Sequence, residues 1–150
     1  MAHSALTVAK YFLSIPDEDA GELVSNLKLQ KLLYYAQGHA VAANGLKNPL
    51  FHDKIYAWKH GPVVKSVYDS YAGHMAGALP REDKAPHLPT DVREFLNEIY
   101  RVYGRFSAWA LRDMTHKEPP WVKNFRPNVR NIEIPLQDLS DFFSENGKKA

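Results

Sequence analysis

The amino-acid sequence predicts a mainly α-helical domain: a compact bundle of about six helices around one central helix, with one short two-stranded β-ribbon. Three observations support this prediction. Residues 26–45 are apolar around most of a helical circumference, which is typical of a helix buried on several sides. Other apolar stripes at helical spacing lie between capping and breaking residues. Two short stretches, 54–59 and 131–134, have strand character and could pair as the ribbon.

The central helix is predicted to run from Asn26 to Gly45. Asn26 can accept a hydrogen bond from a free amide of the first turn, which makes it a candidate N-cap. Gly45 can adopt the left-handed conformation that often ends a helix. One face is built from leucines and alanines, with Leu32 near its middle, and a second apolar row lies beside it.

Polar residues of the central helix form two further groups. An amide row runs between the apolar rows and consists of Gln30, Gln37 and Asn44. We interpret these amides as core groups bonded to neighbouring backbone, with a sharper alternative in which Gln37 fixes the loop at residues 60–62. The face that carries Lys28, Lys31 and Tyr35 is predicted to be solvated.

The elements before residue 90 follow from local signals. Ser4 caps a first helix that stops at Pro16, and residues 16–22 form an acidic loop. After the strand at 54–59, Pro62 is predicted to start a helix, because its missing N–H would be unbonded in the first turn anyway. Gly73 ends that helix. Residues 73–89 are rich in glycine and proline and are predicted to form a loop.

The remaining elements are predicted in the same way. Thr90 or Asp91 caps a helix that ends at Gly104, and Ser107 caps another over residues 108–116. Residues 119–121 start a short helical turn, and 124–131 form a basic loop. Residues 132–134 alternate as the second strand of the ribbon. A last helix follows Pro135, over residues 136–143.

Composition describes one ordinary globular domain over residues 1–150, with a disordered tail expected at 145–150. The net charge is +2, and there is no cysteine, which excludes disulfides and thiolate chemistry. The sequence shows no apolar run of membrane-spanning length and no signal pattern, so we expect a cytoplasmic protein without a membrane partner.

Motifs for catalysis, metals and cofactors are missing, so we predict no enzyme, no catalytic residue, no metal and no cofactor. The seven histidines form no HExxH motif and no pair at helical spacing. No nucleophile elbow and no glycine-rich nucleotide loop occurs. The paired carboxylates lie in flexible loops, where two pKa values are not easily separated.

Two histidines have matching surroundings. His60 follows Trp58 and precedes a proline, and His116 precedes two prolines and Trp121. One interpretation is structural, with each ring packed on an aromatic neighbour. The other is that both histidines and both tryptophans face one concavity that receives a side chain or backbone of a partner.

Basic and aromatic residues alternate near Trp121 and Phe125, where Lys123, Arg126 and Arg130 could bind phosphate. Three charges make a thin patch, and no helix-turn-helix can be placed beside it. Nucleic acid is therefore not the expected partner.

Several blocks, taken together and in order, resemble one known family. They are NLKLQKLLYYAQGHAVAANG, PLF, AWKHGPVVKSVY and YGRFSAWALRDMTHKEPPW. They look like the Panacea domain, the SocA-like antitoxin domain that is also met in phage-associated or GepA-like proteins. The likeness runs from Thr7 to about Phe143.

The resemblance implies an antitoxin that neutralises a protein toxin by direct contact, with the toxin gene usually adjacent. One family member is described as a proteolytic adaptor that delivers its toxin to the ClpXP protease, but no protease-docking segment is identified here. The alternatives are therefore such an adaptor, or a nucleic-acid-binding or phage-related regulator. Some members have an added DNA-binding domain, for which 150 residues leave no room.

The resemblance also sorts the candidate site residues. A first group coincides with the family motif and is interpreted as a pocket or as determinants of the fold: Tyr34, Gln37, Trp58, His60, Gly61, Pro62, Ser107, His116, Pro120 and Trp121. A domain that meets many toxins should vary where it touches them, so contacts are expected outside this motif. The second group, of possible partner-binding residues, is Lys28, Lys31, Tyr35, Lys123, Arg126 and Arg130.

Overall fold

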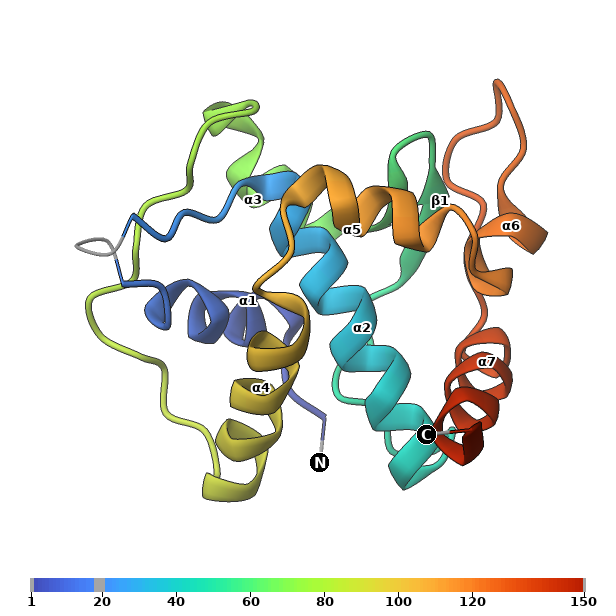
Figure 1. Cartoon of the computed structure of the whole chain (residues 1–150), viewed down its shortest axis with the longest axis horizontal. Coiled ribbons are helices and arrows are strands. Elements are labelled where there is room, and N and C mark those ends of the chain that lie inside the picture. Colours follow the sequence, from blue (N-terminus) through green and yellow to red (C-terminus); the bar gives the residue numbers. More distant parts are fainter. Residues whose placement is uncertain (1, 18–20, 150) are drawn as a thin grey trace.

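Helix α2 (Asn26–Asn44) is the axis of the fold in the computed structural model, which describes residues 2–17 and 21–149 (Figure 1). Side chains are described through residue 144. Within these residues the protein has seven α-helices and one two-stranded antiparallel sheet. The predicted mainly α-helical fold around a central helix with a short ribbon is confirmed.

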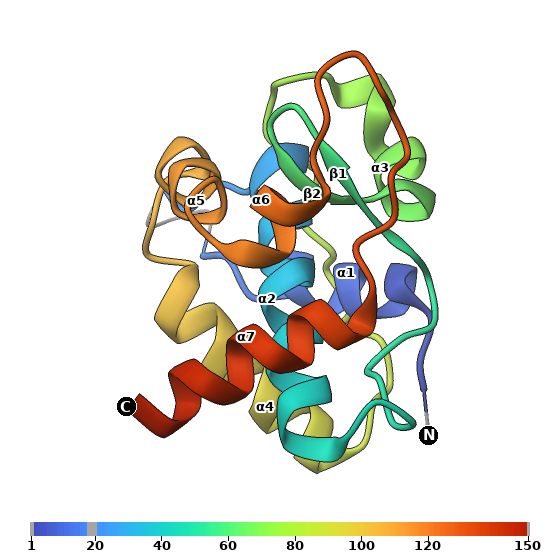
Figure 2. The same ribbon diagram turned by 90° about the vertical axis from the view of Figure 1, so that its right-hand side faces the viewer.

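The other helices enclose α2 on several sides. They are α1 (Ala5–Ser14), α3 (Lys65–Tyr71), the 3-10 turn η2 (Ala72–His74), α4 (Thr90–Tyr103), α5 (Ala108–Thr115), α6 (Pro119–Asn124) and α7 (Leu136–Lys149). Helix α7 crosses α2, while α1 and α4 lie on its other side (Figures 1 and 2). Gly38 allows this crossing to be close, because a Cβ there would overlap the Phe143 ring.

The N-cap of α2 differs from the predicted one. Ser25, not Asn26, is the N-cap, and its Oγ accepts a hydrogen bond from the amide of Lys28. The Asn26 side chain is buried and donates instead to the carbonyl of Tyr68. The helix ends before Gly45 as expected, and Gly45 has a positive φ of 93°, but its ψ of 160° differs from the predicted left-handed helical conformation.

The capping predictions for two other helices are confirmed. Ser4 accepts from the amide of Thr7, and Ser107 accepts from the amide of Ala110. The prediction for α4 was wrong, because Thr90 is its first helical residue and follows Pro89 at the cap position. The predicted acidic loop at 16–22 includes residues 18–20, which lie outside the described residues.

The ribbon consists of β1 (Ile55–Trp58) and β2 (Gly61–Val64), paired antiparallel with Trp58 opposite Gly61. The predicted strand at 54–59 is confirmed. Pro62 does not start a helix, because pairing with β1 keeps residues 61–64 extended and α3 begins only at Lys65.

The expected partner segment, 131–134, does lie against β1, on the edge away from β2. The amide of Ala57 donates to the carbonyl of Ile132 over 2.9 Å, and the amide of Ile134 donates to the carbonyl of Ile55 over 2.8 Å. This contact is a single bridge rather than a strand.

The C-terminal helix extends beyond its predicted end, to Lys149. Ala150 and the side chains of residues 145–149 lie outside the described part, so the disordered tail at 145–150 stays a prediction. None of the helices in the described ranges is both long and apolar enough to cross a lipid bilayer.

Candidate functional site

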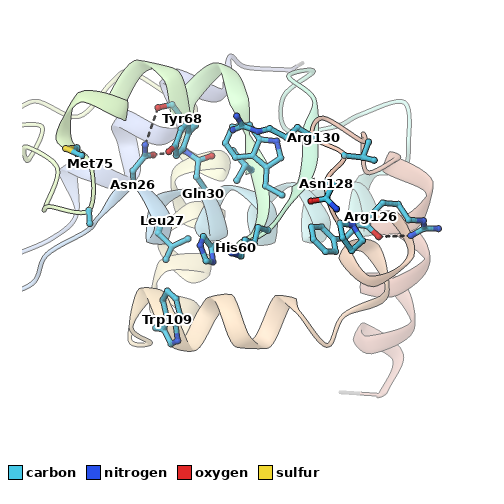
Figure 3. Close-up of a pocket in the computed structure, with 17 residues that line it drawn as sticks. Asn26, Leu27, Gln30, His60, Tyr68, Met75, Trp109, Arg126, Asn128 and Arg130 are labelled. Carbon is cyan, nitrogen blue, oxygen red and sulfur yellow. Dashed lines mark hydrogen bonds between the residues drawn. The ribbon is translucent and has the colours of Figure 1, made fainter.

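One groove of about 1050 Å³ lies at the end of the molecule where the ribbon, α5 and the loop before α7 meet (Figure 3). The ribbon contributes Trp58 and His60, and α5 contributes Trp109. The turn of the ribbon also contributes Lys59. The other lining residues come from the start of α2, from residues 63–76 and from the loop: Asn26, Leu27, Gln30, Val63, Tyr68, Met75, Ala76, Phe125, Arg126, Pro127, Asn128, Val129 and Arg130.

The loop after α6 forms one wall of this groove. It turns back on itself with a bridge between Arg126 and Val129, and it rises beside the ribbon (Figure 2). Asn128 and Asn131 have φ values of 67° and 62°, a conformation that asparagine tolerates better than most residues. The basic segment predicted as a loop is thus an ordered turn.

Trp58 connects the loop to the ribbon. Its indole nitrogen donates to Oδ1 of Asn131 over 3.1 Å, and the guanidinium carbon of Arg130 lies 4.5 Å from the centre of its ring. From behind, the indole nitrogen of Trp121 donates to the carbonyl of Trp58 over 2.7 Å. Trp58 is therefore held through both its side chain and its backbone, and it in turn positions Arg130.

Arg112 organises the opposite wall, from α5. Its guanidinium carbon lies 4.5 Å from the centre of the Trp109 ring, and its Nε donates to Nδ1 of His60 over 3.0 Å. An accepting Nδ1 requires the neutral tautomer of His60 with its hydrogen on Nε2. Burial lowers the pKa of His60, and the charge of Arg112 lowers it further. His60 therefore presents a neutral N–H donor.

The groove combines positive charge with exposed apolar surface. Lys59, Arg126 and Arg130 line it, and none of the lining residues in the described part of the chain is acidic. Among its apolar side chains, Met75 is 82% exposed and Trp109 is 55% exposed. Such surface is typical of a site that binds another molecule.

Buried polar side chains of α2 hold the strand β2, which borders the groove. Lys31 is fully buried and its amine donates to the carbonyl of Pro62 over 3.0 Å, while Gln30 accepts from the amide of Val64 over 2.9 Å. Burial lowers the pKa of Lys31 to about 7, and the nearby charge of Arg112 acts in the same direction. Both contacts fix β2 on the helix.

A carboxylate from Glu118, the residue that precedes α6, lies against the neighbouring part of α2. Glu118 accepts hydrogen bonds from the hydroxyls of Tyr34 and Tyr35, each over 2.9 Å. Burial raises the pKa of Glu118 to about 7, although these two hydrogen bonds act in the opposite direction. Burial also raises the pKa of Tyr34 well above its usual value, so both tyrosines remain donors.

The raised pKa of Glu118 predicts a pH-dependent stability. Unfolded glutamate titrates near pH 4.3, so between roughly pH 4.5 and 7 the folded state holds a proton that the unfolded state has lost. The free energy of unfolding contributed by Glu118 should therefore fall as pH rises through this window. As the pH rises from 4.5 to 7.5, the free energy of unfolding of Glu118→Gln should therefore increase by on the order of 1–3 kcal/mol relative to that of the natural chain.

Urea titrations at several pH values measure this difference. Glu133→Gln is the matched control, because Glu133 is an exposed carboxylate of the C-terminal half. A difference between Glu118→Gln and the natural chain that stays constant over this pH range would contradict the prediction.

The two paired histidines have different surroundings. His60 and Trp58 line the groove, but His116 and Trp121 are not among the lining residues. The His116 ring stacks on Trp121 with centroids 4.0 Å apart and planes 7° apart, which is the structural interpretation. The hypothesis of one concavity for all four residues is wrong for this groove, because its lining includes His60 and Trp58 but neither His116 nor Trp121.

Other motif residues support the fold. Gln37 is fully buried, accepts from the amide of Leu50 and donates to the carbonyl of Phe51. It therefore fixes residues 50–51, and the alternative in which it holds residues 60–62 was wrong. Ser107 is a helix cap, and Pro120 is a buried residue of α6.

The prediction that the face of α2 with Lys28, Lys31 and Tyr35 is solvated was also wrong. Lys31 is buried under the ribbon, and Tyr35 is buried against Tyr103 of α4 and Phe143 of α7, so neither can touch a partner. The amine of Lys28 donates to the carbonyl of Gly104 over 2.6 Å. Lys123 pairs with Asp138 and does not line the groove, whereas Arg126 and Arg130 do.

Trp109, Arg112 and Met75 belong to the groove or its wall but were not sequence candidates. An exposed tryptophan three residues before an arginine on one helix was a usable local signal, because such residues can stack. Among the described residues, no group of three or more histidine, aspartate or glutamate side chains is placed to hold a metal ion.

Comparisons with known proteins identify the family of this chain. Residues 29–122 match the family described as antitoxin SocA-like, Panacea domain. The chain is 31% identical over 111 residues to the curated protein Antitoxin SocA of Caulobacter vibrioides (strain NA1000 / CB15N). That alignment covers 65% of this chain and spans 58% of the relative's length. No solved structure matches the chain. Since the family match covers more than half of the residues, the chain belongs to the SocA-like antitoxin family with a Panacea domain.

Proposed function

We propose that the protein is an antitoxin that neutralises a protein toxin by direct, non-catalytic binding in the cytoplasm. Membership of the SocA-like family supports the antitoxin role. The observation that carries direct binding is the groove, which joins exposed aromatic and apolar side chains to three cationic ones. Protein interfaces are enriched in aromatic residues, methionine and arginine, and this groove has all of them.

Co-expression with the neighbouring gene tests the proposal. That gene alone should stop growth, and co-expression of this chain should restore it. The two purified proteins should form a complex that buries at least about 1,200 Å² and elutes as one species in gel filtration. A harmless neighbouring gene, or a toxic product that does not bind this chain, would refute the proposal.

Delivery of the toxin to a protease is the second mechanism of neutralisation. A host strain that lacks ClpXP separates it from sequestration. If binding alone neutralises the toxin, growth should be restored in this strain as well, and the toxin should accumulate in the complex. Loss of protection together with accumulation of free toxin would favour the adaptor mechanism.

A further inference from the structure

We propose that the groove between the ribbon, α5 and the loop at residues 125–131 is the toxin-binding surface, and that it receives an acidic segment of the toxin that also carries an apolar side chain. The inference rests on the proposed function and names the surface and chemistry that it uses. The groove, of about 1050 Å³, lies at the upper end of the roughly 300–1,000 Å³ of ligand pockets and has room for several side chains of a polypeptide.

Charge complementarity argues for carboxylates in the partner. Lys59, Arg126 and Arg130 line the groove, and no aspartate or glutamate does so among the described lining residues. His60 adds a neutral donor at Nε2–H, because its Nδ1 already accepts a hydrogen bond from Arg112. Every one of these groups donates hydrogen bonds, so a segment of acceptors fits and a basic segment is repelled.

Arg130 is the best prepared of these donors. Its guanidinium is stacked on the face of Trp58, which is itself fixed by Asn131. A cation held over an aromatic ring in this way uses its charge rather than its N–H groups, which remain available for a two-point hydrogen bond with a carboxylate. Less conformational freedom is lost on binding when the cation is already held in place.

Exposed apolar side chains argue for an apolar anchor beside the carboxylates. Trp109 and Met75 are more than half exposed, and Val129 is 50% exposed. Figure 3 shows Met75 and Trp109 toward one end of the groove and Arg130 toward the other. Tryptophan and methionine at the rim of a groove can bury large area against a partner side chain.

The same observations favour a protein over nucleic acid. A cation already lies over one face of Trp58 and over one face of Trp109, which leaves less aromatic surface for stacking bases. Three lining cations also make few phosphate contacts, and the whole chain has a net charge of only +2.

The test measures binding of the purified product of the neighbouring toxin gene to the full chain. The variant Lys59→Glu/Arg130→Glu should lower the affinity about 100-fold, because two attractive pairs become repulsive. The matched control is Lys47→Glu/Lys84→Glu, which changes the net charge equally at exposed residues outside the groove and should stay within about threefold. Circular dichroism and thermal melting establish that each variant is folded, and Lys59→Gln/Arg130→Gln replaces the first variant if it is not.

Five outcomes decide between these possibilities. Selective loss of affinity in the groove variant supports the proposal, and so does its recovery with a toxin variant in which an acidic cluster is changed to lysine. Unchanged affinity overturns the groove but leaves the proposed function intact. A toxin that does not bind the natural chain overturns both. Tight binding of a 20-nucleotide single strand at near-physiological salt, lost in the groove variant, assigns the groove to nucleic acid and overturns the proposal.

Discussion

Gly61→Ala should lower the free energy of unfolding by about 3 kcal/mol. Gly61 has a φ of 110°, a region that side chains disfavour. A Cβ at this position would lie 2.6 Å from Cε of Lys31 and 2.8 Å from Oγ1 of Thr115. Lys31 is fully buried and bonded to Pro62, so it cannot swing away into solvent. Backbone strain and steric overlap therefore add.

Urea titration measures this loss, and Gly73→Ala is its control. Gly73 has open space around its would-be Cβ, and the change there should cost less than about 1 kcal/mol. Equal stability of the two variants would contradict the prediction. Since Gly61 follows Trp58 and His60 in the turn of the ribbon, Gly61→Ala should also weaken toxin binding under the proposed function.

Leu32→Ala should cost about 2–5 kcal/mol in the same measurement, because it leaves a cavity in a closely packed core. Leu32 lies in the middle of α2 and has no exposed surface. Leu46→Ala, at a leucine that is 39% exposed just after the helix, is the control and should cost less than about 1 kcal/mol. A loss below 1 kcal/mol for Leu32→Ala would mean that α2 is not the centre of the core.

Local signals in the sequence predicted most of the helices. The caps at Ser4 and Ser107 and the stop at Gly45 depend on neighbouring residues, so the sequence alone identifies them. The strand at β1 was predicted from its composition, but β2 was not. Pro62 is compatible with a helix start, and only pairing with β1 decides against it.

The candidate site was less predictable, because its parts are distant in sequence. Only the tertiary fold brings Arg130 onto Trp58 and Arg112 onto His60. The sequence predicts an exposed Lys31, because lysine side chains usually lie in solvent. Its burial follows from the packing of the ribbon on that side of α2. The sequence makes His60 a candidate because it lies between a tryptophan and a proline, and Arg130 because basic and aromatic residues alternate before it, whereas the groove that unites them required the fold.

The buried polar side chains of α2 also bear on how the chain selects one topology. Asn26, Gln30, Lys31 and Gln37 each bond the backbone of a different, distant residue or segment. If the helix turned about its axis, or if two of these segments exchanged places, several donors and acceptors would be buried unpaired at about 1–3 kcal/mol each. Leucine and alanine alone would tolerate such rearrangements more easily. The amides and the amine therefore act against competing folds, and α2 is a template that accepts each segment at only one position.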